Sequence, residues 1–140
     1  MGIVLKLKKC DYQKIVEHCK NALPNEACGL VAGTIENGIK TITKVYLLTN
    51  MDASSSHFSM NPEEQLKTVK DARANGAEII GSFHSHPNTP AMPSAEDKRL
   101  AYNPDMEYLI LSLQELSHPV LRAFGITHQK NVVRHKIEYL

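Results

Sequence analysis

Apolar residues return at helical spacing in two segments of the chain. The first runs from Asp11 to Leu23, where apolar side chains recur every three or four residues until Pro24 ends the pattern. The second begins at Asn61 with the run Asn-Pro-Glu-Glu, which combines an N-cap, a proline at the first helical position and acids in the first turn, and it continues to Gly76. Both segments are predicted to form helices that pack an apolar face on a sheet.

Runs rich in apolar and β-branched residues predict the strands of that sheet. Cys28–Ile35 and Ile39–Leu48 are two such runs, and the Asn37-Gly38 pair between them indicates a hairpin, because a type I′ turn needs positive φ at both positions. A short helix is expected from Ser94 to about Tyr102. Further strands are expected at Glu78–Phe83, extended through the histidines that follow, and at Tyr108–Leu113, Val120–Thr127 and Val132–Tyr139. This order predicts an α/β (α+β) fold with a curved, mixed, mostly antiparallel sheet flanked by helices.

Length and charge narrow the class of protein. The chain has 140 residues, 42% of them apolar, which suits a single domain spanning residues 1–140. The net charge of +1 arises from interspersed acids and bases, so neither nucleic acid nor a membrane is an expected partner. The apolar start, residues 2–7, is broken by Lys6 and is too short for a signal peptide, and an odd number of cysteines, three, argues against a disulfide framework. These features predict a cytoplasmic protein.

One short segment, residues 81–97, carries a set of potential metal ligands. His84 and His86 are separated by one residue, so on a strand both imidazoles leave the same face. Pro87 ends the strand, and Asp97 lies in the first turn of the helix that opens at Ser94, with its side chain aimed back toward the loop. Two imidazoles and one carboxylate, with a fourth position open to water, are typical of a catalytic zinc site.

Two simpler explanations of this segment have to be weighed. With seven histidines in 140 residues, an H-x-H pattern arises by chance about 0.35 times, but the full spacing with Ser94 and Asp97 arises only about 0.001 times. The run from Ser94 to Asp97 is also a capping box, in which a serine and an acid three residues later satisfy free helix N–H groups. The chance explanation is therefore weak, whereas the capping explanation for Asp97 stays open.

The residues His84-Ser-His86-Pro followed by Ser94 and Asp97 resemble the JAMM motif of the MPN-domain metalloproteases. That family also carries an acid in a Pro-x-Glu-x-Cys-Gly segment, which is present here with Glu26 as the acid. The match continues through Asn50 and the stretch from Phe58 to Pro62, so it covers about residues 10 to 115.

The resemblance implies the MPN architecture, which is related to the cytidine deaminase fold, and one Zn²⁺ per chain held by His84, His86 and Asp97. It also implies that Glu26 acts as the catalytic base and returns the proton to the leaving amine, while Ser94 helps to stabilise the oxyanion. Zinc lowers the pKa of its bound water toward 7, which suits a neighbouring carboxylate base. Whether zinc rather than iron or manganese is bound in the cell stays open, although this ligand set favours zinc.

The resemblance also indicates a substrate class. The chain is compact like the stand-alone prokaryotic members, whose substrates are ubiquitin-like sulfur carriers ending in Gly-Gly. The expected function is therefore a zinc-dependent peptidase or isopeptidase that hydrolyses the bond after the Gly-Gly tail of a ubiquitin-like sulfur-carrier protein and releases an amino acid or a short extension. Glycines suit a narrow cleft because they have no side chain. The identity of the carrier and the formation of a homodimer stay open.

Three alternatives remain. The chain could be a noncatalytic MPN-type scaffold that binds protein partners, although its intact motif argues against this. It could be an isopeptidase that acts on another ubiquitin-like modifier. The third alternative is a metal-dependent deaminase, which the related fold suggests. That chemistry expects a C-x-x-C, and none is present, which argues against it.

Five histidines lie outside the motif and have no ligand partner at a recognisable spacing, so they are expected to be surface or hydrogen-bonded residues: His18, His57, His118, His128 and His135. His57 is a partial exception, because it precedes a segment that runs near the cleft in this family.

Overall fold

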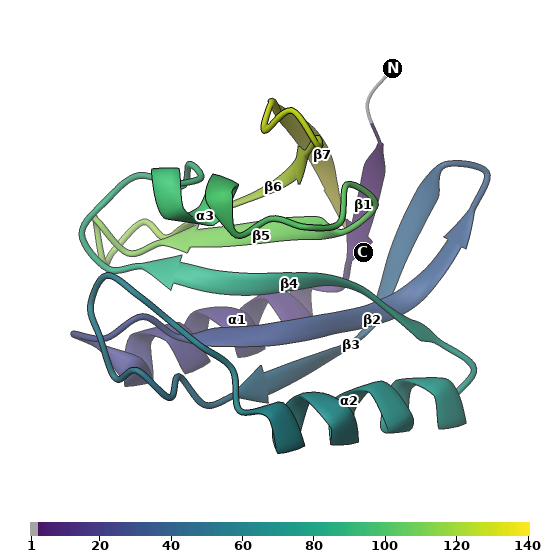
Figure 1. Cartoon of the computed structure of the whole chain (residues 1–140), viewed down its shortest axis with the longest axis horizontal. Helices are drawn as coiled ribbons and strands as arrows, with labels where there is room; N and C mark the ends of the chain where they lie inside the picture. The colour runs from purple at the N-terminus through teal and green to yellow at the C-terminus, as the bar shows by residue number, and fades with distance from the viewer. Residues whose placement is uncertain (1–2) are drawn as a thin grey trace.

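The computed structural model describes residues 3–140, so Gly2 of the apolar start lies outside the described residues. The elements follow one another as shown in Figure 1: β1 (Val4–Leu7), α1 (Lys9–Ala22), β2 (Cys28–Glu36), β3 (Ile39–Leu48), α2 (Pro62–Ala74), β4 (Glu78–His86), α3 (Ala95–Arg99), β5 (Glu107–Ser112), β6 (Val120–Ile126) and β7 (Val132–Tyr139). No helix among residues 3–140 is long and apolar enough to cross a membrane.

The strands form one sheet that closes on itself in the order β1-β3-β2-β4-β5-β6-β7. Four of the strand pairs are antiparallel, whereas β1 is parallel to both β3 and β7, and β4 is parallel to β5. The predicted mixed, mostly antiparallel sheet with flanking helices is confirmed. Strand β1 was not predicted, yet it closes the barrel, because three of its residues pair with β3 on one side and all four pair with β7 on the other.

Most predicted elements agree with the structure within a few residues, but the third helix does not. It was expected from Ser94 to about Tyr102, and that prediction is wrong at its C-terminal end, since α3 stops at Arg99 with Leu100 as its C-cap. One further turn would bury little, because the Tyr102 side chain is 77% exposed. Pro104 also disfavours helical geometry at the residue before it.

The hairpin predicted between β2 and β3 is confirmed by its backbone geometry. Asn37 and Gly38 have φ angles of 51° and 77°, the positive values that a type I′ turn requires. This turn sets the register in which Glu36 pairs with Ile39 and Cys28 pairs with Leu48 at the far end of the strands.

Two apolar clusters cover opposite faces of the sheet. The inner face packs against α1, where Ile15 and Cys19 join Val31, Phe83 and other fully buried residues of the main core. The outer face of β2 and β3 carries the smaller cluster of Cys28, Leu30 and Leu48, next to α2. All three cysteines are free, as the sequence predicted.

A charged network lies buried inside the closed sheet. The Lys40 ammonium lies 2.8 Å from the Glu107 carboxylate, whose other oxygen is 2.7 Å from Nδ1 of His135. These residues come from β3, β5 and β7, so the network joins strands that are far apart in the sequence. His135 is therefore a hydrogen-bonded histidine, as expected.

Candidate metal centre and active site

Strand β4 places the two motif histidines on the outer face of the sheet. Because side chains alternate along a strand, His84 and His86 share one face while Phe83 and Ser85 point into the core. The strand is paired on both sides, with His84 opposite Cys28 of β2 and Ile110 of β5, so its backbone is fixed. Both imidazoles are buried, at 4% and 5% exposure.

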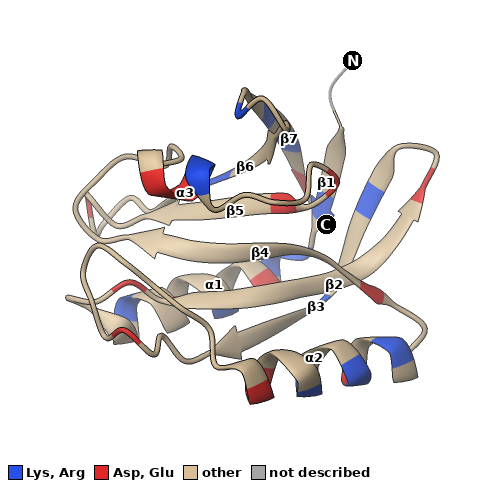
Figure 2. Ribbon diagram, viewed as in Figure 1, with Lys and Arg blue, Asp and Glu red and all other residues tan. Residues whose placement is uncertain are grey.

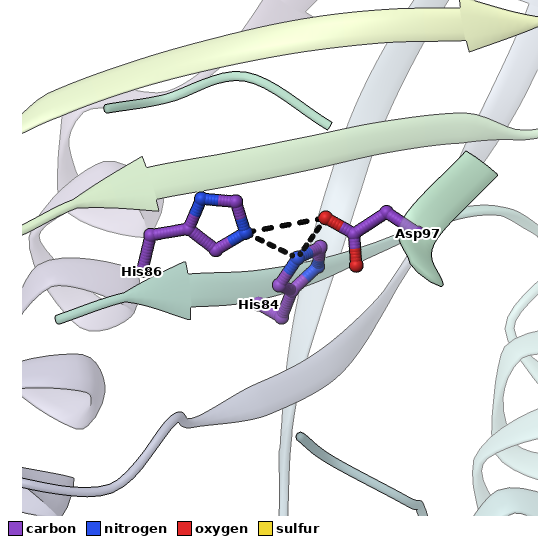
Figure 3. A group of neighbouring side chains, drawn as sticks. All are labelled: His84, His86 and Asp97. Atoms are coloured by element: carbon purple, nitrogen blue, oxygen red, sulfur yellow. Dashed lines mark hydrogen bonds and ion pairs between the residues drawn. The ribbon is translucent and has the colours of Figure 1, made fainter. Parts of the chain in front are cut away.

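The structure brings His84, His86 and Asp97 together at one point (Figure 3). The Nε2 atoms of the two histidines are 3.1 Å apart, and Oδ2 of Asp97 lies 3.1 Å from His84 Nε2 and 3.2 Å from His86 Nε2. Tetrahedral ligands bound to zinc at about 2.0–2.1 Å lie about 3.3 Å from one another. The three atoms therefore have the spacing that a single zinc ion needs.

Hydrogen bonding of the second ring nitrogen prepares His86 to bind a metal. Its Nδ1 lies 2.9 Å from the carbonyl oxygen of Pro90, which can only accept, so Nδ1 carries the proton. When the ring is neutral, its Nε2 lone pair is directed at the meeting point of the three residues; when the ring is protonated, Nε2–H donates to Asp97 instead. His84 is held differently, because its ring stacks on Phe58 with a centroid separation of 4.7 Å.

Asp97 caps the helix and faces the imidazoles with the same oxygen. Ser94 Oγ accepts a hydrogen bond from the Asp97 backbone at 3.0 Å, and Asp97 Oδ2 accepts one from the Ser94 backbone at 2.9 Å. Burial, the largest single influence, raises the pKa of Asp97, but hydrogen bonds from His84 and His86 together outweigh it and hold that pKa well below its usual range. The capping box is thus present, and it orients a charged carboxylate toward the histidines.

The pKa of His86 is shifted by the same contacts with Asp97 and Pro90. Burial alone lowers its pKa, but hydrogen bonds to Asp97 and to the Pro90 carbonyl raise it above the ordinary value. The site therefore attracts a positive charge between the three side chains, and a divalent cation supplies that charge without a proton. The donor set and its spacing fit a zinc ion.

Glu26 is positioned beside this cluster by contacts of the residues around it. The neighbouring Ala27 exchanges two hydrogen bonds with Ser85, which lies between the two histidines on β4. The Glu26 backbone also donates to the Ser54 carbonyl at 2.8 Å and accepts from the Asn50 side chain at 2.9 Å. These bonds place Glu26 next to β4 although 58 residues separate it from His84 in the sequence.

The Glu26 side chain is only 6% exposed, and this burial changes its acidity. Burial raises its pKa from 4.5 to about 7, with a smaller opposing effect from His86 and a reinforcing one from Asp97. The carboxyl group is therefore poised between its two protonation states near neutral pH, which suits a group that accepts and returns a proton.

Ser94 can cap the helix and still donate a hydrogen bond from its hydroxyl group. Its oxygen accepts the Asp97 N–H through a lone pair, which leaves the hydroxyl hydrogen available for another acceptor. The residue is exposed to solvent. Capping and donation thus use different parts of one hydroxyl group.

The structure adds residues that the motif did not identify. Asn50 holds the site together, since its side-chain amide donates to the carbonyls of both Glu26 and His57 at 2.9 Å. The His57 Nδ1 lies 2.6 Å from a Glu96 carboxylate oxygen, which joins the 50–60 loop to α3. His57 therefore ties this loop to the helix that carries Asp97, and its contribution to the cleft stays a prediction. No sequence spacing could reveal either pairing, because the partners are distant along the chain.

A cleft of about 240 Å³ opens beside the cluster. It reaches His84 and Asp97 at one end, and its walls are mainly apolar: Leu30, Phe58, Met60, Pro93, Leu100, Tyr108, Ile110 and Ile126. The 50–60 loop, held by the isolated bridge between Asn50 and Met60, forms one wall. An extended chain can thus reach the metal cluster along an apolar surface.

Comparison with known proteins shows which proteins the chain resembles in sequence and in structure. A mycobacterial CysO-cysteine peptidase, from Mycobacterium tuberculosis, is 30% identical over 112 residues, which cover 80% of this chain and 75% of the relative. A desampylase from Haloferax volcanii is 32% identical over 90 residues, which cover 64% of this chain and 63% of the relative. A solution structure of a protein from Desulfitobacterium hafniense has 47% identity and a TM-score of 0.89, covering 97% of this chain and 92% of that chain.

The fold, the site and these relatives define a hydrolase of the JAMM type. Residues 9–126 match the family of prokaryotic homologs of the JAB domain. The chain belongs to this family, and the resemblance read from its motif is confirmed.

Proposed function

We propose that this protein is a zinc-dependent peptidase that hydrolyses the bond after the C-terminal Gly-Gly of a ubiquitin-like sulfur-carrier protein and releases an amino acid or a short extension. The convergence of His84 Nε2, His86 Nε2 and Asp97 Oδ2 at 3.1–3.2 Å is the observation that carries the proposal. Similarity to a CysO-cysteine peptidase supports the substrate class.

In this proposal, His84, His86 and Asp97 hold one Zn²⁺, which when bound polarises the scissile carbonyl and makes its water ligand more acidic. Asp97 is kept in place by the two capping bonds with Ser94, and His86 by its bond to the Pro90 carbonyl. The ligands are therefore oriented by the protein before substrate arrives, which lowers the cost of assembling the site.

Glu26 is the proposed general base. Its carboxylate accepts the proton of the attacking water and then gives that proton to the amine that leaves. A pKa near 7 is well matched to both transfers, because the group binds and releases a proton at little cost at neutral pH. The hydrogen bonds of Ala27 with Ser85 hold the backbone next to Glu26 against β4, which supports this role.

Ser94 is the proposed donor to the oxygen on which negative charge develops. Its hydroxyl hydrogen is not used in the helix cap, and the residue is exposed, three positions before Asp97. A donor at this position stabilises the tetrahedral transition state more than the ground state.

The proposed substrate enters along the apolar cleft beside His84 and Asp97. Glycines at the scissile end suit this site because only residues without side chains allow the substrate backbone to approach the buried ligands closely. The reaction is proposed to take place in the cytoplasm, where the three free cysteines remain reduced.

Mass spectrometry of a Gly-Gly-tailed sulfur carrier extended by cysteine tests the proposal. Zinc-loaded wild-type protein should remove the extension, whereas His84→Ala and wild-type protein with a chelator should not. Glu26→Gln should bind zinc in equal amount yet lose turnover; a matching loss of zinc would refute the role of base. Absence of cleavage by stoichiometrically zinc-loaded protein, across carriers with cysteine or peptide extensions, would refute the proposed reaction.

A second candidate is cleavage of an isopeptide bond to another ubiquitin-like modifier, which similarity to a desampylase supports. Both reactions use the same site residues, and they differ only in the amine that leaves. The same assay separates them when the carrier is joined to the side chain of a lysine instead of to the α-amine of cysteine.

A further inference from the structure

Strands β6 and β7 separate from each other and leave an opening in the wall of the barrel. Their pairing is limited to residues 123–126 of β6 and 132–135 of β7. Beyond this, β6 stays alongside β5, and β7 turns to run alongside β1 (Figure 1). The facing edges of residues 120–122 and 136–139 have no strand partner across the opening.

A cleft of about 470 Å³ lies at this opening, which we term the cationic seam. Its cations are Arg122, Arg134 and Lys136, and its apolar part consists of Leu121, Ile137 and Tyr139. Arg134 and Lys136 are two residues apart on β7, so they leave the same face of the strand. Basic positions on both β6 and β7 are visible in Figure 2.

The three cations of the seam have no anionic partner among residues 3–140. Among residues 3–140, Arg122, Arg134 and Lys136 take part in no ion pair and no side-chain hydrogen bond, and the buried Nε of Arg122 has no acceptor. By contrast, Lys40 and Lys44 each contact a carboxylate at 2.8 Å. Three like charges around one cleft repel one another, so binding of an anionic group is favoured there.

We propose that the cationic seam binds an acidic polypeptide segment in an extended conformation. The unpaired strand edges offer backbone donors and acceptors, the cations offer partners for carboxylates, and the apolar residues accept side chains between the acidic ones. A segment that alternates acidic and apolar residues matches all three features, because its side chains alternate between two faces. A lone phosphate or sulfate would use only the cations.

The seam is separate from the candidate metal centre. Ile110 pairs with both His84 and Arg122, so the two residues lie two strand spacings apart, about 10 Å. Between them, Ile110 itself is fully buried beneath Ala91. Binding at the seam therefore does not require the metal ligands, and the inference stands whether or not the proposed function is correct.

Fluorescence anisotropy with a labelled ten-residue peptide of alternating Glu and Val tests this inference. The seam variant combines Arg122→Gln, Arg134→Gln and Lys136→Gln. A control variant removes three exposed positive charges from α2 instead, through Lys67→Gln, Lys70→Gln and Arg73→Gln. The peptide should bind to wild type and to the control with similar affinity, and about tenfold or more weakly to the seam variant. Added salt should weaken the binding.

Four results would overturn the inference. The first is absence of binding to wild type, and the second is an equal loss of binding in the control variant. The third is displacement by inorganic phosphate at the concentration of the peptide, or equal binding of a Lys-Val peptide. The fourth is a combination of two observations: the seam variant self-associates, and wild type binds no peptide. This combination would mean that the cations only protect unpaired edges from other strands.

A folding control keeps the test decisive. Circular dichroism and the thermal midpoint of each variant are measured first, since Arg122 is half-buried and its replacement could disturb the sheet. If the triple variant does not fold, the double variant Arg134→Gln with Lys136→Gln replaces it, because both side chains are exposed. Unchanged affinity in that folded double variant would equally overturn the inference.

Discussion

Replacing Lys40 by Met tests the buried charged network inside the barrel. The Lys40 ammonium donates to the Glu107 carboxylate at 2.8 Å and to the Asp105 carbonyl at 2.6 Å. The two side chains of the ion pair are 6% and 1% exposed, so water cannot replace the lost partner. Met keeps most of the length and the apolar part of lysine but removes the charge.

The expected loss in free energy of unfolding depends on the carboxylate that remains buried in the barrel. Among the described residues, Glu107 would keep one side-chain partner, His135 at 2.7 Å, and would be an incompletely neutralised carboxylate in the core. Removal of one member of a buried ion pair typically costs about 3–5 kcal/mol, because the other charge stays buried. We expect Lys40→Met to lie near the lower end, about 3 kcal/mol, since His135 still contacts Glu107.

Urea denaturation of the metal-free protein measures this cost. At a slope of about 2 kcal/mol/M, a loss of about 3 kcal/mol lowers the midpoint by about 1.5 M. Lys44→Met is a matched control on the same strand, because Lys44 also contacts a carboxylate, that of Asp71, at 2.8 Å. Its pair is 54% and 43% exposed, so a much smaller change is expected.

The comparison of the two variants tests whether burial makes the Lys40 pair more important for stability than the exposed Lys44 pair. If Lys40→Met lowered the midpoint no more than Lys44→Met does, burial would not be what makes the first pair important. The reasoning from desolvation would then be refuted. If Lys40→Met unfolded the protein outright, the comparison would be repeated with Glu107→Gln, which keeps both neighbours and most of the hydrogen-bonding capacity.

Three other predictions concern the site and its surroundings. First, burial raises the Glu26 pKa from 4.5 to about 7, so this group favours the fold fully below pH 4.5 and loses its contribution as pH rises through 7. Urea titrations of metal-free protein should therefore show that, as the pH rises between these values, the free energy of unfolding of Glu26→Gln increases relative to that of wild type by up to about 3 kcal/mol. Parallel pH profiles of the two free energies would contradict the raised pKa. Second, Ser94→Ala should lower turnover by about 10²–10³ and stability by about 1 kcal/mol, because the donor and the helix cap are both lost. Ser94→Thr should recover the stability in thermal melts. Full turnover by Ser94→Ala would exclude the serine from catalysis. Third, Gly29→Ala should prevent stable folding, since a Cβ there would overlap the backbone oxygen of Tyr46. A normal circular dichroism spectrum and melting temperature for this variant would show that the strands can separate to admit a methyl group.

Local sequence rules predicted the parts of the site that depend on neighbouring residues. Alternation along β4 places His84 and His86 on one face, and the Ser94 capping box orients Asp97, so the cluster of these three side chains follows from spacing. The Asn37-Gly38 turn was predictable for the same reason, because both conformations are set within a few residues. The end of α3 was mispredicted, since helical propensity beyond Arg99 is not supported by burial.

Contacts between distant residues were not predictable in this way. The parallel pairing of β1 with β3 and β7, which closes the barrel, has no local signature because β1 has only four residues. The pairing of His57 with Glu96 and the hydrogen bonds of Asn50 likewise depend on how loops pack over the strands.

The sequence by itself determined which chemical groups this protein can bring to a metal site, because strand alternation and helix capping act over short spans of chain. Only the tertiary structure decided their environment. It buried Glu26 near His86 and Asp97, so that its pKa rises to about 7, and it left Arg122 and its cationic neighbours without a carboxylate partner in the described residues. Burial and charge depend on every segment that packs nearby, and the fold alone brings those segments together.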